Sequence, residues 1–335
     1  MSQTIVALDC MGGDNAPGEI VKGGIEALKE NKDVFLKMVG RQEDVNRELE
    51  KYDYDKTRVE VVNATEVIET GEPPVVAIRT KKDLVKCMYM VKHGECDALV
   101  SAGSTGATLV GGHVIVGRIK GVERPPLAPL IPTEKGGALL IDCGANVDAK
   151  PSNLVQFAQM GSIYMENICK VKNPKVGLVN IGAEEEKGNN LAKETYQLLS
   201  NLEGINFIGN IEAREIPEGK ADVVVCDAFV GNVILKMYEG VGGVLLKKVK
   251  GTLMTSLKTK IGALLIKKEL KETLKTFQMD QYGGAPLLGL KGLVVKTHGN
   301  SKAIEVKNSI IQCISFKEMN INDKISKKLA VKKEN

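Results

Sequence analysis

The chain's 335 residues exceed what one hydrophobic core usually holds, so we expect two lobes or one large sheet. Hydrophobic residues make up 43% of the chain and 35 residues are glycines, which fits an α/β protein rich in strand-to-helix turns. A net charge of +4, no tryptophan and only 4% aromatic residues argue against a dedicated nucleic-acid binder. The cysteines lack CxxC spacing and histidine is scarce, so no metal site is expected.

The start of the chain already reads as a strand, and no signal-peptide pattern precedes it. No apolar run approaches the ~18 residues that are needed to span a bilayer. We therefore expect a cytoplasmic protein whose cysteines are reduced.

Strand-like runs alternate with helical patterns along the chain. The predicted strands are residues 5–9, 34–39, 59–62, a run ending at 101, 138–142, 175–180, 205–209, 221–226 and 293–296. Helices are predicted from about residue 18 and over 81–92. This alternation predicts an α/β fold, a three-layer α/β/α arrangement around a large, mostly parallel sheet. The proline-rich segment 123–132 could cross between lobes.

The segment from about 230 to 278 is the longest helical stretch without a strand, and Gly251 is expected to divide it. We expect residues 240–278 to form a projecting helical arm that contacts a membrane or a second subunit. Apolar residues recur there at spacings of three and four, next to several lysines. The residues predicted on one helical face are Leu253, Leu257, Ile261, Leu264 and Leu265. A basic amphipathic helix of this kind can lie in the headgroup region of an anionic membrane, and a core-facing or dimer-facing helix is the alternative.

The most informative stretch is the strand-to-helix junction at 97–109. An apolar strand ends there in Ser/Gly residues that lead directly into a helix. The unpaired N–H groups and the dipole at a helix start favour an anion, such as phosphate or a developing oxyanion. The expected ligand-binding residues are Gly103, Ser104, Thr105 and Gly106. The alternative is a tight turn in which Ser104 only caps the helix.

Similar polar clusters follow five other strand ends, which is where ligands bind in open α/β sheets. Their candidate substrate-binding residues are Asp9, Gly12, Gly13, Asp14, Asn146, Asn180, Asp227, Gly231, Tyr282, Gly283 and Gly284. Lys296, His298 and Ser301 share one loop, which suggests a contact with an anion. The aspartates could hold Mg²⁺, but we favour turn capping.

None of these clusters matches a strong general motif. There is no GxxxxGK[ST], no GxGxxG after the first strand and no GxSxG. Cys10 and Cys143 could carry an acyl group only if a neighbouring base or a helix N-terminus lowered the thiol pKa. We favour small residues packed under their turns.

Taken together and in this order, the segments resemble the bacterial phosphate acyltransferases of phospholipid synthesis, the acyl-[acyl-carrier-protein]:phosphate enzymes. The resemblance covers nearly the whole chain. It is carried by DCMGGDNAP (9–17), VSAGSTGA (100–107), VGRIKG (116–121), GANVD (144–148), NIG (180–182), KGN (187–189), FVGN (229–232), YGGAPLLGLK (282–291) and HG (298–299). This sequence departs from the family pattern at three positions. Members of the family usually have Ala at the position of Cys10 and often have Val at that of Cys143. Many have Asn at the position of Ser104.

The resemblance implies a fold similar to the isopropylmalate dehydrogenase and phosphotransacetylase group, with residues 1–335 forming one catalytic unit of two interlocked subdomains. It implies transfer of a long acyl chain from acyl carrier protein to inorganic phosphate. A membrane glycerol-3-phosphate acyltransferase would use the acyl phosphate. It also implies a homodimer that sits peripherally on the membrane. No strong general base is required, because phosphate is a good nucleophile and thiolate a good leaving group, and no cofactor is expected. We predict that Lys187, Asn232 and His298 surround the reacting centre.

Two other functions stay open at this point. A metal- and NAD-dependent dehydrogenase of the same fold group would use the aspartates for Mg²⁺. A non-catalytic, membrane-associated scaffold would bind the carrier protein without releasing acyl phosphate.

Overall fold

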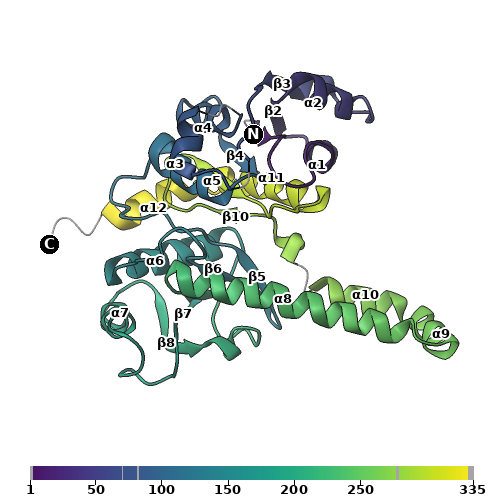
Figure 1. Ribbon diagram of the computed structural model, residues 1–335. Coiled ribbons are helices and arrows are strands. Elements are labelled where there is room, and N and C mark those ends of the chain that lie inside the picture. Colours follow the sequence, from purple (N-terminus) through teal and green to yellow (C-terminus); the bar gives the residue numbers. More distant parts are fainter. Residues whose placement is uncertain (1–2, 70, 81–82, 277–278, 331–335) are drawn as a thin grey trace.

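The computed structural model describes residues 3–69, 71–80, 83–276 and 279–330. Two lobes lie one above the other, each built on its own sheet, and a helical arm extends to one side (Figure 1). The α/β class and the mostly parallel pairing are confirmed. The prediction of one large sheet is wrong, because the strands are divided between a six-stranded and a five-stranded sheet.

The first lobe holds a six-stranded sheet in the order β10-β11-β4-β1-β2-β3, parallel except for β10. Its strands are β1 (Thr4–Asp9), β2 (Val34–Gly40), β3 (Val59–Asn63), β4 (Ala98–Ser101), β10 (Ala285–Pro286) and β11 (Leu293–Lys296). Its helices are α1 (Gly18–Glu30), α2 (Gln42–Leu49), α3 (Pro74–Thr80), α4 (Asp83–Lys92), α5 (Thr105–Gly111) with the π-helical turn η2 (Gly112–Val116), and α11 (Ala303–Glu318). The chain leaves this lobe after η2 and returns at β10, so its two ends build one sheet.

The second lobe holds a five-stranded sheet in the order β5-β6-β9-β7-β8, parallel except for β5. Its strands are β5 (Leu130–Thr133), β6 (Gly136–Ile141), β7 (Lys175–Asn180), β8 (Asn206–Glu212) and β9 (Val223–Val225). Helix α6 (Pro151–Asn167) packs on this sheet, and α7 (Asn190–Ser200) packs beside α6. The short edge strand β5 overlaps the end of the segment 123–132, which we had interpreted only as a proline-rich crossing.

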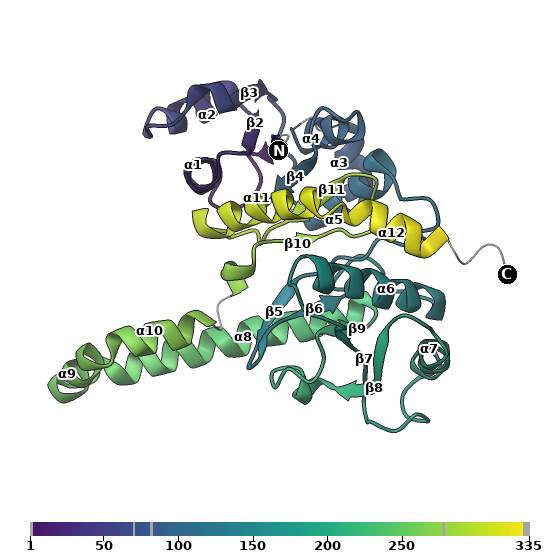
Figure 2. The ribbon, with the colours of Figure 1, turned by 180° about the vertical axis from the view of Figure 1, so that it is seen from behind.

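An apolar core joins the two lobes. One cluster of buried side chains includes Leu8 of the first sheet, Val223 of the second, and Ile310 of α11. Helix α12 (Ile321–Ala330) follows α11 and packs against α6 of the other lobe (Figure 2). The C-terminal helices therefore hold the lobes together, and the carboxyl ends of both sheets meet between them.

The arm consists of the end of α8 (Ala228–Leu253), α9 (Leu257–Leu265) and α10 (Lys267–Thr276), which folds back along α8 (Figures 1 and 2). We had predicted that Gly251 divides this stretch. The prediction is wrong, because α8 continues through Gly251. The break comes at 254–256, where the Ser256 hydroxyl accepts from the Thr259 N–H at 3.1 Å and starts α9. Leu253 therefore lies on a different helix from the other four predicted arm residues. Residues 277 and 278 of the predicted arm lie outside the described residues.

Helix α8 has 26 residues and, in the part of the chain that the structure describes, is the one helix long and apolar enough to cross a membrane by length and composition. The start of α8 is held against the second sheet, since Gly231 is buried and Tyr238 donates from its hydroxyl to the Pro132 carbonyl at 2.5 Å. Asn232, Lys236 and Glu239 of the same helix line a cavity between the lobes. We therefore treat α8 as part of the folded catalytic unit.

Candidate active site

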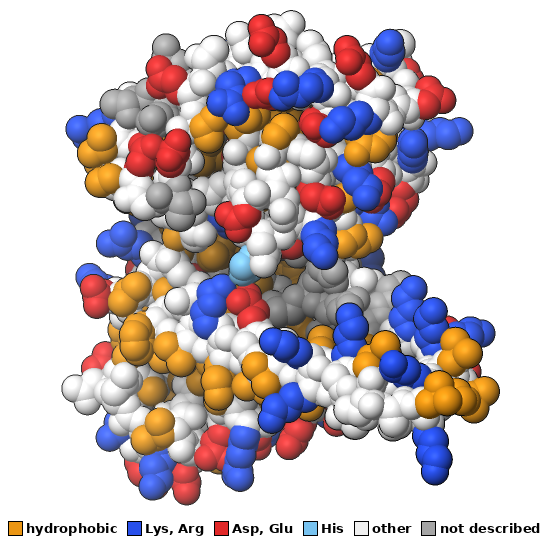
Figure 3. Space-filling view, turned by 45° about the vertical axis from the view of Figure 1, so that its right-hand side comes forward, with side chains coloured by type: hydrophobic (Ala, Val, Ile, Leu, Met, Phe, Trp, Pro, Cys, Tyr) orange, Lys and Arg blue, Asp and Glu red, His pale blue; other side chains and the backbone are white. Residues whose placement is uncertain are grey.

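A cavity of about 620 Å³ lies between the lobes, at the carboxyl ends of both sheets. The first lobe contributes the segment after β11 and the start of α5, and the second lobe contributes α8 and the turn after β6. Its polar lining residues are Thr105, Asn232, Lys236, Glu239, Lys296, Thr297, His298, Asn300 and Glu305. Figure 3 shows this side of the molecule hollowed between the lobes, with acidic and basic side chains at the hollow. We call this space the polar cavity.

Three neighbouring strands end together beside the polar cavity. Asp9, Ser101 and Lys296 are the last residues of β1, β4 and β11, and they are direct partners across the strands. All three are buried. The register of the first sheet therefore brings a carboxylate, a hydroxyl and an ammonium group to one place, although they lie up to almost 300 residues apart in the chain.

Lys296 is a buried lysine without a carboxylate partner. It is 6% exposed, and the ion pairs found among the described residues include none for it. Its Nζ donates to the Thr297 carbonyl. Burial lowers the pKa of Lys296 to about 8, although Glu305 and Asp9 act in the opposite direction. Thr297 Oγ1, also buried, has no hydrogen-bond partner in the described structure. A cation and a hydroxyl are thus available to an anionic ligand.

His298 and two residues of α8 form a second charged group that bridges the lobes. The Glu239 carboxylate accepts from Lys236 Nζ at 2.8 Å and lies 3.8 Å from His298 Nε2. This carboxylate raises the pKa of His298 above its ordinary value, against the effect of burial. The imidazole therefore favours its charged form. Ser301 donates from its hydroxyl to the His298 carbonyl at 2.6 Å and fixes the loop.

Asp9 holds the turn that follows β1. Its carboxylate accepts from the Ser101 hydroxyl at 2.6 Å and from the Gly12 N–H at 3.1 Å. Burial raises the pKa of Asp9, and these hydrogen bonds partly offset the effect. A Cβ on Gly12 would lie 2.6 Å from the Gly103 nitrogen, so glycine is needed where the two turns touch. Asp9 and Gly12 thus lie under the turn, and they position the backbone that borders the site.

In the second lobe, Asp142 holds the turn that follows β6, as Asp9 holds the turn after β1. Its carboxylate accepts from the N–H groups of Leu127, Gly144, Ala145 and Asn146 at 2.8–3.1 Å. The Asn146 amide donates to the same carboxylate at 2.7 Å and to the Pro125 carbonyl at 3.0 Å. Asn146 therefore secures its own turn. Gly231 of α8 packs against this turn, because a Cβ there would lie 1.8 Å from the Asp142 carbonyl oxygen.

Several predicted site residues cap helices. Ser104 is the N-cap of α5, with its hydroxyl accepting from the Ala107 N–H at 3.4 Å. Asp227 is the N-cap of α8 and accepts from Phe229 and Val230 at 2.9 and 3.0 Å. Thr105, the first residue of α5, is exposed and lines the polar cavity. Of the two hydroxyls predicted to bind an anion, that of Thr105 is the freer one.

The structure brings only part of the predicted set together. The polar cavity collects Thr105, Asn232, Gly283, Gly284 and His298. Gly13 adjoins it, because the Asp14 N–H donates to the Gly299 carbonyl at 2.7 Å. Tyr282 packs its ring near Gly137 of β6. Asn180 and Asp227 line a different cavity of about 490 Å³ on the far side of the α8 start, and Asn146 lines a third.

Lys187 is exposed on the loop after β7. Its carbonyl accepts from the Asn180 amide at 3.0 Å, and its side chain lines none of the three cavities described above. Its placement at the reacting centre, next to Asn232 and His298, stays a prediction.

Sequence reasoning missed Lys236, Glu239 and Thr297. Helical spacing from Asn232 could have predicted Lys236 and Glu239. Residues four and seven positions after Asn232 share its helix face, and we had not extended the FVGN motif into the helix that follows it.

The described carboxylates were also compared with the requirements of a metal site. Asp9 and Asp142 are occupied by backbone N–H groups, and within the described ranges no group of three His, Cys, Asp or Glu residues is placed to hold a metal ion. The described residues therefore do not support the Mg²⁺ that the dehydrogenase alternative needs.

Comparison with known proteins shows which family the chain belongs to. Residues 4–324 match the family model described as "Fatty acid synthesis protein". A protein from Clostridium novyi named phosphate acyltransferase is 51% identical over 322 residues, which are 96% of this chain and 97% of the relative. A phosphate acyltransferase from Clostridium acetobutylicum is 48% identical, with 97% and 98% covered.

Solved structures show the same fold at low identity. A phosphotransacetylase from Streptococcus pyogenes matches with a TM-score of 0.61 at 17% identity, covering 94% of both chains. One from Staphylococcus aureus matches with a TM-score of 0.59 at 18% identity, covering 93% of this chain and 94% of the other. On the family model and on relatives of about half identical sequence, the chain belongs to the fatty acid synthesis protein family that contains the bacterial phosphate acyltransferases.

Proposed function

We propose that the protein transfers a fatty acyl group from acyl-[acyl-carrier-protein] to inorganic phosphate, and that the polar cavity is where this happens. The observation that carries the proposal is Lys296, a buried ammonium with no carboxylate partner among the described residues, in a cavity that also holds His298 and Lys236. Burying an unpaired charge is costly unless a partner of opposite sign compensates for it. Phosphate is such a partner.

The chemistry requires positioning and charge neutralisation more than proton transfer. An oxygen of hydrogen phosphate attacks the thioester carbonyl carbon, and a C–O bond forms. The tetrahedral intermediate then expels the thiolate of the carrier's prosthetic group as the C–S bond breaks, and the thiolate takes a proton from solvent. The products are acyl phosphate and the free carrier thiol.

Several residues of the polar cavity have a role in this scheme. Lys296 and His298 neutralise the charge of the phosphate. Lys236 is linked to His298 by the Glu239 carboxylate, which contacts both side chains. Asn232 and Thr105 offer an amide and a hydroxyl that can orient the phosphate or the carbonyl oxygen. The Asp9 turn fixes the backbone of Gly12, Gly13 and Gly103 at the edge of the site. Lys187 would have to reach the reacting centre from its exposed loop.

Trapping the product tests the proposal directly. The purified protein is incubated with acyl carrier protein thioester and phosphate in the presence of hydroxylamine, which converts acyl phosphate to a hydroxamate. We expect phosphate-dependent hydroxamate formation and release of the carrier thiol. The Lys296→Met variant is the matched control and should form almost none. Thiol release without any dependence on phosphate would contradict the proposal.

The partners follow from the same chemistry. The acyl donor is acyl carrier protein, and a membrane glycerol-3-phosphate acyltransferase would consume the product. A homodimer in the cytoplasm, attached peripherally to the membrane, fits an enzyme whose product carries a lipid tail. The dehydrogenase alternative is not favoured, because the relatives at about 50% identity are phosphate acyltransferases.

The arm supports the membrane part of the proposal. Leu257, Ile261, Leu264 and Leu265 are 54–78% exposed, and Lys258, Lys260, Lys267 and Lys268 surround them. Exposed apolar residues with a basic fringe bind anionic bilayers through both burial and charge. Leu253, at the end of α8, is half-buried and contributes less.

A further inference from the structure

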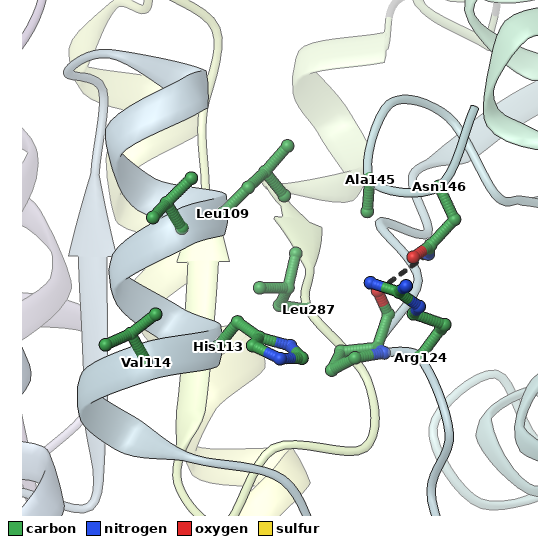
Figure 4. Close-up of a pocket in the computed structure, with 9 residues that line it drawn as sticks. Leu109, His113, Val114, Arg124, Ala145, Asn146 and Leu287 are labelled. Carbon is green, nitrogen blue, oxygen red and sulfur yellow. Dashed lines mark hydrogen bonds between the residues drawn. The ribbon is translucent and has the colours of Figure 1, made fainter. Parts of the chain in front are cut away.

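A second, apolar cavity lies in the same space between the lobes. It has a volume of about 220 Å³. In Figure 4, Leu109, His113 and Val114 come from the α5–η2 helix on one side, Ala145, Asn146 and Arg124 come from loops on the other, and Leu287 lies between them. We call it the apolar groove.

Every wall of the apolar groove continues a wall of the polar cavity. Thr105 borders the polar cavity and Leu109 the groove, one helical turn apart on the same face of α5. Three loop or strand segments contribute to both spaces in the same way, two residues apart. They are Leu127 and Pro125, Cys143 and Ala145, and Ala285 and Leu287. Leu127 and Leu287 also pair through an isolated β-bridge. The two spaces are therefore neighbouring compartments of one cleft.

We propose that the apolar groove binds the alkyl chain of the acyl donor and of the acyl phosphate product, with Leu109, Val114 and Leu287 determining the preferred chain length. This rests on the proposed function. The thioester carbonyl would lie near Thr105, between the cations on one side and the groove on the other. An acyl phosphate has the same polarity, with a dianionic head and an apolar tail.

The polar tips of the groove are compatible with an alkyl chain. Burial, together with the charges of Arg118 and Arg124, lowers the pKa of His113 and so favours the neutral form of its ring. Arg124 is exposed and lies at the open side, where its methylene stem can cover apolar surface. The Asn146 amide is already engaged with Pro125 and Asp142.

The other large apolar space is closed off from the reacting centre. The cavity of about 490 Å³ beyond α8 is lined by Val230, Val233 and Ile234. Between it and the polar cavity, the backbone of Gly231 presses against the Asp142 carbonyl, too closely for even a methyl group. This backbone contact separates the two cavities at the start of α8. This cavity supplies the matched control.

The size of the groove predicts the shape of the chain-length profile. The groove has a volume of only about 220 Å³, so it can hold part of a long alkyl chain and not the whole of it. Each methylene moved from water into the groove strengthens binding about fourfold. We expect kcat/KM to rise with acyl length until the groove is filled, and to change little beyond that length.

The test compares decanoyl and butanoyl thioesters of acyl carrier protein in three variants. Leu109→Trp fills the groove, and Val114→Trp narrows it from a position that is 63% exposed and therefore safe for folding. In both, the decanoyl-to-butanoyl ratio of kcat/KM should fall by about tenfold or more. Val233→Trp, in the closed-off cavity, should leave the ratio at the wild-type value. Dodecylphosphonate binding, measured by calorimetry, should weaken in the first two variants only.

An unchanged ratio in folded Leu109→Trp and Val114→Trp proteins would overturn the inference, and a loss of ratio in Val233→Trp would move the chain to the other cavity. Failure of the proposed function looks different. In that case the wild-type protein gives no hydroxamate from any chain length, whereas a wrong groove leaves hydroxamate formation intact in every variant.

Discussion

The polar cavity and the helical arm both depart from the usual rule that charged side chains are exposed and apolar side chains are buried. The cavity buries a charged residue, and the arm exposes apolar ones. In the cavity, the residue Lys296 is 6% exposed, although lysine is almost never fully buried unless it is paired. On the arm, Leu265 is 78% and Leu257 75% exposed, next to lysines that stay in water. Each region is incomplete by itself. A buried cation calls for an anion, and an exposed apolar face calls for an apolar surface, so the kind of departure indicates the kind of partner.

The two regions also share one helix. The start of α8 presents Asn232, Lys236 and Glu239 to the cavity, and the end of α8 carries the arm. The polar cavity and the proposed membrane contact are thus connected by one helix, as the proposed function would require. The predictions below separate the two regions or test the charge in the cavity.

The largest effect is expected when the buried charge is removed. Lys296→Met keeps the length of the side chain and deletes the ammonium. We expect kcat/KM for phosphate to fall by about 10²–10³, the loss typical of a donor that stabilises transition-state charge. The same variant should be more stable than the wild type by roughly 1–3 kcal/mol below pH 8, because the cost of burying the charge disappears.

The sign of this stability change depends on pH. The pKa of Lys296 is about 8 in the folded protein and 10.5 as a free group. Below pH 8 both states hold the proton and the full cost applies. Between pH 8 and 10.5 the folded protein sheds the proton first, so wild-type stability rises and the advantage of Lys296→Met shrinks. Thermal unfolding from pH 6 to 10 measures this. A variant that is less stable at every pH would show that Lys296 is mainly structural.

The pH profile of catalysis is the second test of the cavity. As the pH rises through about 8, Lys296 loses its charge, and kcat/KM for phosphate should fall by about tenfold per pH unit. Lys296→Arg should move this alkaline limb out of the measurable range, since arginine stays charged. The limb would have to come from another group if it stayed near pH 8 in that variant.

The sequence predicted some residues of the polar cavity and the position of the arm, but it did not predict which distant residues lie together in the cavity. Polar residues after strand ends identified Asn232 and His298, because parallel strands bring their carboxyl ends to one edge. The sequence could not show that Asp9, Ser101 and Lys296 are neighbours, since strand pairing is a long-range choice that no local pattern encodes. The division into two sheets, confirmed only by the structure, has the same cause.

The distinction between a cap and a ligand was also beyond the sequence. Ser104, Asp227 and Asn189 accept hydrogen bonds from N–H groups of their own helices. The same residue types would be expected in an anion site, because both uses depend on unpaired N–H groups at a helix start. Only the coordinates show which oxygens are already engaged.

Replacing exposed apolar residues of the arm by acidic ones tests its proposed contact with the membrane. Leu257→Glu with Ile261→Glu should abolish sedimentation with anionic liposomes, while activity on soluble acyl carrier protein thioester stays within about twofold, because neither residue lines the polar cavity. Leu198→Glu on α7, at a site that is 48% exposed, is the matched control and should still sediment. If the double variant sediments as well as the wild type, the arm serves another contact, such as a second subunit.

The smallest effect is expected at the two cysteines next to the site. Cys10 and Cys143 are 0% and 3% exposed, and burial raises the pKa of both thiols well above the ordinary value. Their Sγ atoms donate to the carbonyls of Leu8 and Leu140, at 3.5 and 3.8 Å. A nucleophilic cysteine must be a thiolate, so neither is prepared to accept an acyl group. Cys10→Ala with Cys143→Val should therefore keep kcat/KM within about threefold and lose about 1–2 kcal/mol of stability from repacking. Mass spectrometry of acid-quenched wild-type enzyme should find no acyl adduct. An acyl-cysteine that forms as fast as the enzyme turns over would replace direct attack by phosphate with a two-step mechanism.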